Sequence, residues 1–346
     1  MSEKVIKSYK AFDKNMQCRE FQYEVGKEYG MDGEIKCCKR GFHACKSPME
    51  VWNHYDMLRS RFAEVEQSGK IEEEENSTKV CSSHIKIKAE LKLADIINIG
   101  VEWLKDITSP SKVKATGTLN DNGGYYAKIG SSGDYAQIGS SGDSAKIGSS
   151  GYYAQIGSSG DYAKIGSSGD YAKIGSSGDS AQIGSSGDYA KIGSSGDSAQ
   201  IGSSGYYAKI GSSGDSAKIG SSGDYAQIGS SGDYAKIGSS GDSAKIGSSG
   251  YYAQIGSSGD YAKIGSSGDY AKIDSTGEDS VIMCAGKESK AKAKAGSWIT
   301  LSEWKWNDDK KRRVPVCVKT EYVDGNNIKA DTWYQLKNGE FVEVDD

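Results

Sequence analysis

The side chains of this sequence that are best suited to bind a metal ion lie close together near its beginning. They are Cys37, Cys38, His43 and Cys45, which fall within nine residues. A structural zinc site normally takes its ligands as two closely spaced pairs. The spacing here does not match Cys-x-x-Cys, and no second pair follows. We therefore expect packing roles for these side chains, and neither a metal site nor a cofactor.

Carboxylates recur at a fixed interval in the middle of the chain, where the unit Gly-Ser-Ser-Gly-Asp-Tyr-Ala-Lys-Ile repeats every nine residues. Glycine-rich nonapeptides bind calcium when they follow the pattern G-G-x-G-x-D-x-U-x. When the two patterns are aligned on the fourth-position glycine, the Asp of this unit lies one place early and its Ile one place late. Tyrosine also replaces the Asp at positions 125, 152, 206 and 251. The repeat therefore predicts a solvated corner Asp rather than a calcium ligand.

Tyrosine and lysine in the same unit could offer aromatic rings and positive charge to a nucleic acid. Within the array, however, eleven Lys are matched by thirteen Asp. The whole chain is also close to balance, with 43 Lys and Arg against 47 Asp and Glu. This balance removes the usual electrostatic basis for binding a polyanion or an anionic membrane. Direct nucleic-acid binding is not expected, and the array has no nucleophile and base pair that would indicate catalysis.

The repeat also dictates the fold of the region that carries these residues. Seventeen copies run without insertion from Tyr125 to Ile273, and Ala and the Ile two places later never vary. Alternate side chains of an extended strand face opposite ways, so Ala and Ile point inward while Tyr or Ser and Lys or Gln point to solvent. Gly-Ser-Ser-Gly then supplies the corner. This pattern predicts a parallel β-solenoid rather than a flexible linker, because a linker needs no fixed phase.

Two copies per coil would place the residue before Ala in two columns. One column is a nearly continuous row of tyrosines, whereas most serines at this position fall in the other. A triangular coil of three copies would break the row, so the coil of eighteen residues is preferred, and the array is then roughly 40 Å long. The expected tyrosine ladder and binding face consist of Tyr135, Tyr153, Tyr171, Tyr189, Tyr207, Tyr225 and Tyr261, interrupted by Ser243.

Non-repetitive sequence flanks the array on both sides. Residues 1–110 are expected to form an α+β module, with a helix beginning after Ser47 and a half-buried strand from Ile85 to Leu93. Residues 111–295 form the solenoid, with regular copies over 125–273 and degenerate end coils to about 291. Residues 296–346 are predicted to form a small antiparallel β cap. The fold class is thus mainly β, and the flanks protect strand edges that would otherwise be open.

Two groups of motifs lie outside the array. They are Tyr9-Lys10-Ala11-Phe12, Gly41-Phe42-His43-Ala44-Cys45 and Tyr55 near the start, and Asp331-Thr332-Trp333-Tyr334 and Gly339-Glu340-Phe341-Val342 near the end. On these motifs, the N-terminal module resembles an uncharacterised domain that precedes such repeats in proteins of bacteriophages and prophages, and the ending resembles the tail of the same proteins. The two modules cover about half of the chain. The resemblance implies a phage-encoded protein that acts inside a bacterium, and it brings no established activity.

A second likeness concerns the N-terminal module alone. Gly41-Phe42-His43, the predicted helix with Tyr55 and the predicted strand over 62–65 are similar to the layout of ADP-ribosyltransferase folds. This likeness implies a transferase that uses NAD and carries a catalytic glutamate. No single residue can be assigned to that role among Glu64, Glu66 and Glu90.

Cysteine usage and hydropathy indicate the compartment. The seven cysteines are odd in number, which makes a poor disulfide framework and suits a reducing environment. No apolar run is long enough for a membrane span, and none follows the charged N-terminus as in a secretory signal. We therefore expect the protein in the bacterial cytosol.

Rigid repetition and exposed tyrosines indicate binding rather than catalysis. Tyrosine buries a large area at an interface with few rotamers to lose, and a solenoid adds reach. We expect a non-enzymatic protein whose tyrosine-rich face engages a host protein or ribonucleoprotein complex, such as a defence or nuclease complex that it inhibits. Two alternatives are an ADP-ribosyltransferase-like enzyme with the solenoid as a spacer, and a structural protein of the virion.

Overall fold

The computed structural model describes residues 4–37, 39–74, 78–108 and 125–346, which form two compact units. The first unit ends at Trp103, and the second runs from Leu104 to Asp346. Strands account for 47% of the residues and helices for 5%. Within these ranges no helix is both long enough and apolar enough to cross a membrane. The predicted boundary near residue 110 lies outside the described residues.

The N-terminal unit is built on an antiparallel sheet with the strand order β4-β7-β5-β1-β6. β7 pairs with β6 as well as with β5, so four of the five strands close into a ring. The strands are β1 (Ile6–Phe12), β4 (Glu28–Gly30), β5 (Phe42–Cys45), β6 (Arg61–Glu73) and β7 (Lys79–Leu91), with a hairpin of β2 (Gln17–Cys18) and β3 (Phe21–Gln22), and α1 (Leu93–Thr108) follows β7. The half-buried strand predicted from Ile85 to Leu93 is confirmed as far as Leu91, where β7 ends, and Ile85 and Ile87 are fully buried. Leu93 instead begins α1.

The helix predicted after residue 47 is only a short 3₁₀ helix, η1 (Met49–Asn53), so Tyr55 lies beyond it. The chain turns away at Asp56, whose side-chain Oδ1 accepts the backbone N–H groups of Leu58 and Arg59 at 2.9 and 3.2 Å. An Asp that bonds to nearby backbone in this way offers the chain an alternative to the next helical turn. Residues 49 to 58 therefore do not form one continuous helix.

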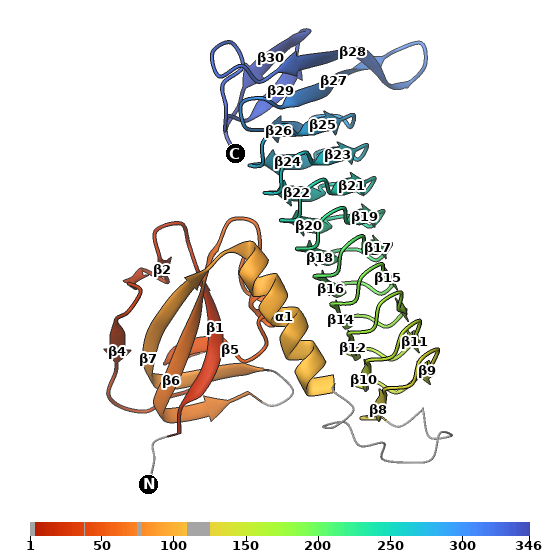
Figure 1. Cartoon of the computed structure of the whole chain (residues 1–346). Helices are drawn as coiled ribbons and strands as arrows, with labels where there is room; N and C mark the ends of the chain where they lie inside the picture. Colours follow the sequence, from red (N-terminus) through yellow and green to blue (C-terminus); the bar gives the residue numbers. More distant parts are fainter. Residues whose placement is uncertain (1–3, 38, 75–77, 109–124) are drawn as a thin grey trace. The chain divides into compact units, whose positions relative to one another are not determined.

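The second unit is a parallel β-solenoid of about ten turns, whose coils stack in Figure 1. Each coil gives one strand to each of two sheets, and the strand is the segment Lys/Gln-Ile-Gly-Ser. The first sheet contains β8 (Lys128–Ser131), β10 (Lys146–Ser149), β12 (Lys164–Ser167), β14 (Gln182–Ser185), β16 (Gln200–Ser203), β18 (Lys218–Ser221), β20 (Lys236–Ser239), β22 (Gln254–Ser257), β24 (Lys272–Ser275) and β26 (Lys290–Lys292). The second sheet contains β9 (Gln137–Ser140), β11 (Gln155–Ser158), β13 (Lys173–Ser176), β15 (Lys191–Ser194), β17 (Lys209–Ser212), β19 (Gln227–Ser230), β21 (Lys245–Ser248), β23 (Lys263–Ser266) and β25 (Val281–Cys284).

The register of these strands confirms the predicted solenoid and its eighteen-residue coil. Ile147 lies opposite Ile165 in the first sheet, and Ile156 lies opposite Ile174 in the second. The two invariant residues of each copy face the interior, and Ala172 is fully buried. Isoleucine therefore stacks on isoleucine from coil to coil. A single coil buries too little apolar surface to be stable alone, and this stacking buries more.

The corner differs from the one predicted. The first Gly and Ser of Gly-Ser-Ser-Gly complete the strand, and the turn is made by the following Ser-Gly-Asp-Tyr. From Tyr135 to Tyr270, the Tyr or Ser before each Ala has φ between 55° and 59°, which is the left-handed region. The serine that ends each strand faces inward, not outward. Ser167, Ser185 and Ser203 are fully buried, and their hydroxyls have no hydrogen-bond partner among the described residues.

Antiparallel hairpins cover the end of the array, as the sequence predicts. β27 (Trp298–Asn307) extends the second sheet by pairing with β25, and β28 (Arg312–Tyr322) pairs with β27. β29 (Tyr334–Lys337) extends the first sheet next to β26, and β30 (Glu340–Glu343) pairs with β29. Leu301, Tyr334 and Leu336 pack into the same apolar core as the array isoleucines. The cap therefore continues both sheets and closes the core.

Candidate binding surface along the solenoid

The backbone of the corner fixes the position of each tyrosine ring. The N–H of Tyr153 donates to the carbonyl oxygen of Asp170 at 3.0 Å, and the N–H of Tyr171 donates to that of Asp188 at 2.8 Å. The predicted solvated Asp also links the coils, because Asp170 Oδ1 accepts the N–H of Asp188 at 2.8 Å. Since these bonds repeat in coil after coil, neighbouring rings leave the backbone in the same direction.

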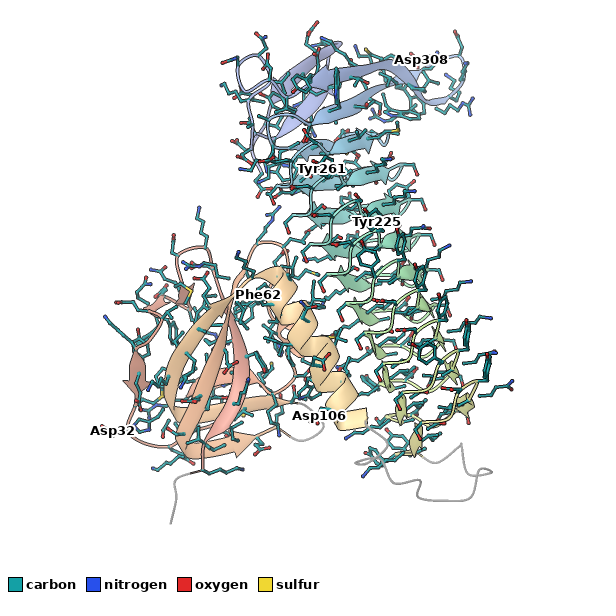
Figure 2. All side chains as sticks on the ribbon, viewed as in Figure 1. Asp32, Phe62, Asp106, Tyr225, Tyr261 and Asp308 are labelled. Carbon is teal, nitrogen blue, oxygen red and sulfur yellow. The ribbon has the colours of Figure 1, made fainter. Side chains whose placement is uncertain are left out.

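Six of the seven predicted tyrosines form one continuous stack. Adjacent ring centroids lie 4.9–5.2 Å apart, and their planes are within 17° of parallel. We call this stack the long ladder, and it consists of Tyr135, Tyr153, Tyr171, Tyr189, Tyr207 and Tyr225. Tyr261 occupies the same column, but Ser243 separates it from Tyr225, and the ring of Tyr261 contacts no other ring in the described part of the chain. Figure 2 labels Tyr225 and Tyr261 on their different coils.

A second stack, at the opposite corner of the coil, was not predicted. Tyr234, Tyr252 and Tyr270 lie 5.1 and 4.8 Å apart with planes within 9° of parallel. Lys287 ends this short ladder, with its Nζ 4.7 Å from the centroid of the Tyr270 ring and hydrogen-bonded to its hydroxyl. The signal was present in the sequence as three consecutive tyrosines eighteen residues apart, but the serines earlier in that column obscured it.

Stacking decides which parts of the rings a partner can reach. The inner tyrosines of the long ladder keep between 36% and 44% of their surface exposed, whereas the terminal Tyr135 keeps 69%. Each inner ring has both faces covered by its neighbours, so the exposed portion is the ring edge and the phenol. A nucleic-acid base stacks on an open ring face. The ladder therefore suits contacts to ring edges and hydroxyls, as in protein interfaces, better than base stacking.

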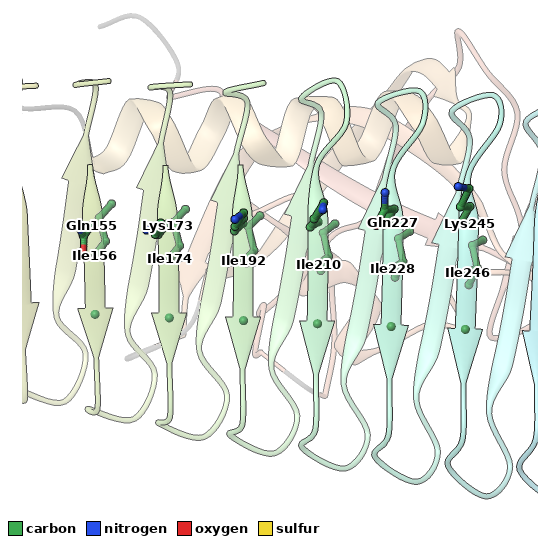
Figure 3. A pocket seen from close by; sticks show the side chains of 18 of the residues that line it. Gln155, Ile156, Lys173, Ile174, Ile192, Ile210, Gln227, Ile228, Lys245 and Ile246 are labelled. Atoms are coloured by element: carbon green, nitrogen blue, oxygen red, sulfur yellow. The ribbon is translucent and has the colours of Figure 1, made fainter. Parts of the chain in front are cut away.

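A shallow groove of about 1310 Å³ runs along the outer face of the second sheet. Its lining Lys or Gln in each coil lies two positions after the Tyr or Ser of the long-ladder column. Figure 3 shows its lining side chains on successive strands. Five lysines and three glutamines line it, and the described lining contains no acidic residue. The glycines of these strands form the floor, and a Cβ built on Gly175 or Gly193 would meet no atom within 4 Å. Glycine in an open strand marks a site where another backbone or ligand can approach closely.

The cysteine and histidine cluster is dispersed in the structure. The Cys37 thiol donates to the backbone oxygen of Glu72 at 3.5 Å. Cys45 is buried, and desolvation raises the pKa of its thiol to about 12. Cys38 lies outside the described residues. In the described ranges no three or more His, Cys, Asp or Glu side chains are grouped so that they could hold a metal ion.

The glutamates considered for a transferase are separated from the residues that suggested one. His43 and Tyr55 both line a cavity of the N-terminal unit, and none of the three glutamates is among its described lining residues. Each is instead in an ion pair on the strands. The pairs are Glu64 with Lys7 at 2.8 Å, Glu66 with Lys88 at 3.1 Å, and Glu90 with Arg61 at 2.6 Å. The cavity therefore does not receive a candidate glutamate.

The fold and its surface define a capped two-sheet β-solenoid that presents tyrosine ladders, joined to a separate N-terminal unit. Residues 6–99 match the model of a protein family described as a domain of unknown function, DUF7666. No curated protein matches the chain, and no solved structure matches it. The family match covers the N-terminal unit alone and does not extend to the solenoid.

Proposed function

We propose that this chain is a non-enzymatic binding protein whose long ladder contacts a macromolecular partner. The observation that carries the proposal is the stack of six parallel rings, held by backbone hydrogen bonds that repeat in each coil. Ordering a side chain at an interface normally costs about 0.5–1.5 kcal/mol. Rings that already stack on their neighbours avoid most of this cost.

The dimensions of the ladder fit a protein interface. Five ring-to-ring steps of 4.9–5.2 Å give a row of about 25 Å. A specific protein interface buries about 800 Å² on each partner, which corresponds to a patch about 28 Å across. The ladder with the adjacent lysine and glutamine groove supplies such a patch. Phenol hydroxyls can donate and accept, and lysines add donors, so a partner surface rich in carboxylates and carbonyls is favoured.

The proposed partner is a protein or a ribonucleoprotein complex of the bacterial host, such as a defence or nuclease complex that the chain inhibits in the cytosol. Resemblance of both ends of the chain to phage and prophage proteins supports this choice. Covered ring faces support a protein contact over direct contact with nucleic acid.

Replacing ladder tyrosines by serine is expected to abolish capture of the partner without unfolding the solenoid. The variant changes Tyr153, Tyr171, Tyr189 and Tyr207 together. Serine already occupies the same corner position with the same φ of 56° at Ser180 and other copies, so the backbone accepts it. The measurement is affinity capture from bacterial lysate with the full chain as bait. We expect a stoichiometric partner with the unchanged chain and its loss with the variant.

The short ladder provides the matched control for this experiment. Changing Tyr234, Tyr252 and Tyr270 to serine removes stacked rings of the same kind from the opposite corner. This control chain should retain the partner. Equal capture by the unchanged chain and the long-ladder variant would refute the proposal.

A further inference from the structure

The N-terminal unit contains a cavity of about 1240 Å³ that the proposed function does not use. Its walls come from β1, the β2–β3 hairpin, β5 and the segment after η1. We call it the N-terminal cavity. Segments distant in the sequence meet there, among them Lys10, Cys18, Phe21, His43 and Tyr55.

The lining of this cavity is strongly basic in a chain of net charge −4. Six cationic residues line it, and they are Lys10, Lys14, Arg19, Lys39, Arg59 and Lys79. Asp13 and Glu20 are the acidic residues among the described lining, and Lys79 also pairs with Glu74 outside it, at 3.9 Å. The Asp13 carboxylate is already engaged, because its Oδ1 accepts the backbone N–H groups of Asn15 and Gln17, each at 2.8 Å. The excess of positive charge therefore favours an anion in the cavity.

Lys10 is the unusual member of this set because it is 97% buried, with 3% of its surface exposed. Its Nζ donates to the carbonyl oxygen of His43 at 3.0 Å and to the Cys18 sulfur at 3.5 Å. No carboxylate pairs with it in the described part of the chain. A buried cation is costly unless an opposite charge accompanies it. An anionic ligand would supply that missing partner.

Aromatic rings surround the same amine and continue toward the opening. The Lys10 Nζ lies 5.6–5.9 Å from the ring centroids of Phe12, Tyr23 and Tyr55. Phe21, on the hairpin, keeps 44% of its surface exposed, and its centroid is 4.8 Å from that of Tyr23. A flat apolar group could therefore pack against Phe21 while an anionic group reaches the basic side chains.

We propose that the N-terminal cavity binds a small molecule that combines phosphate groups with a planar ring, which is the chemistry of a nucleotide. The phosphates pair with Lys10 and the basic residues at the opening, and the ring packs against Phe21. This site is independent of the ladders and of whatever partner they contact.

The test is calorimetric titration of the full chain with ADP, pyrophosphate and adenosine as separate probes. We expect ADP to bind more tightly than pyrophosphate or adenosine, because only ADP carries both parts. Lys10→Met should weaken ADP binding at least tenfold. Without ligand, the same variant should melt at an equal or higher temperature, because methionine fills the site without a buried charge.

Two further variants keep the outcome interpretable. Lys27→Met removes an exposed lysine outside the cavity that pairs with Glu24 at 2.7 Å, and it should leave ADP binding unchanged. Arg19→Gln changes an exposed cation at the hairpin tip and should weaken binding even if the Lys10 variant does not fold. Absence of ADP binding at about 1 mM, which corresponds to only about −4 kcal/mol, would overturn the proposal. Unchanged ADP affinity in both Lys10→Met and Arg19→Gln would do the same, as would adenosine binding as tightly as ADP.

Discussion

Alanine in place of Gly196 is expected to destabilise the solenoid strongly. A Cβ built on Gly196 would lie 2.1 Å from the carbonyl oxygen of Gly178 and 2.5 Å from its carbonyl carbon. Both atoms are backbone, so no flexible side chain can move aside. Because the same contact links every coil to the preceding one, relief of the clash would require separating two coils. The free energy of unfolding is expected to fall by on the order of 4 kcal/mol or more, which is a large share of the stability of a domain.

Gly193→Ala is the matched control, three residues away on β15. A Cβ there would meet nothing within 4 Å. Alanine in a strand interior makes the free energy of folding more favourable than glycine does, by about 0.5–1 kcal/mol. This variant should therefore be at least as stable as the unchanged chain. Circular dichroism during urea unfolding measures both changes. Similar unfolding midpoints for the two variants would contradict the close packing of the corners.

Removing the C-terminal cap is expected to make the chain self-associate. A chain that ends at Ala295 loses β27 to β30 and leaves β25 and β26 as uncovered parallel strands. Their backbone N–H and C=O groups then offer a template for the strands of another copy. Loss of Leu301 and Tyr334 also opens the end of the apolar core. Light scattering after size exclusion should show oligomers that grow with protein concentration.

A shortened array with an intact cap separates loss of the cap from loss of length. Deletion of residues 182–199 removes one complete coil and keeps both sheets in register, since paired residues are eighteen apart. We expect that chain to self-associate no more than the unchanged one does. A chain ending at Ala295 that stays monomeric at high concentration would show that the cap is not needed to protect the edges.

The core of the solenoid was predictable because one observation fixed it. Ala and Ile never vary, and their two-residue spacing places both inside, as Ala172 and Ile174 are. The columns of tyrosine likewise revealed the offset of eighteen residues and the long ladder. These inferences need only period and alternation, and the sequence contains both.

The corner could not be predicted in the same way, because glycine has two uses that look alike in a sequence. Gly-Ser-Ser-Gly suggested a turn in which glycine takes a positive φ. In the structure tyrosine takes the positive φ, and the second glycine is required for close approach to the preceding coil. A non-glycine residue in the left-handed region is uncommon. The contacts between successive coils explain why tyrosine rather than glycine takes the positive φ.

The N-terminal unit shows the limit of local patterns. Alternation identified the strand that contains Ile85 and Ile87, which lies within β7. The burial of Lys10 and its position near Cys18 and Tyr55 depend on tertiary packing of three segments. A lysine in the sequence gives no sign that it will be buried, so the cavity was not predictable.

The most direct test of the central claim compares two deletions that differ by one nonapeptide. Removing residues 182–190 shifts the remaining copies by half a coil, so Tyr171 is followed in its column by Ser198 and the long ladder is broken. Removing residues 182–199 places Tyr207 after Tyr171 and keeps a continuous ladder of five rings. Both deletions preserve the sequence of the repeat and keep Lys or Gln at every position of the two rows, and the deletion of eighteen residues also keeps each remaining residue in its own row.

We therefore expect the shorter of these two chains to capture more of the partner than the longer one. We predict that the chain lacking eighteen residues retains the partner and that the chain lacking nine residues loses it, while both fold with similar strand content. Equal capture by the two chains, or capture only by the longer one, would contradict the claim that an aligned tyrosine ladder is the binding surface.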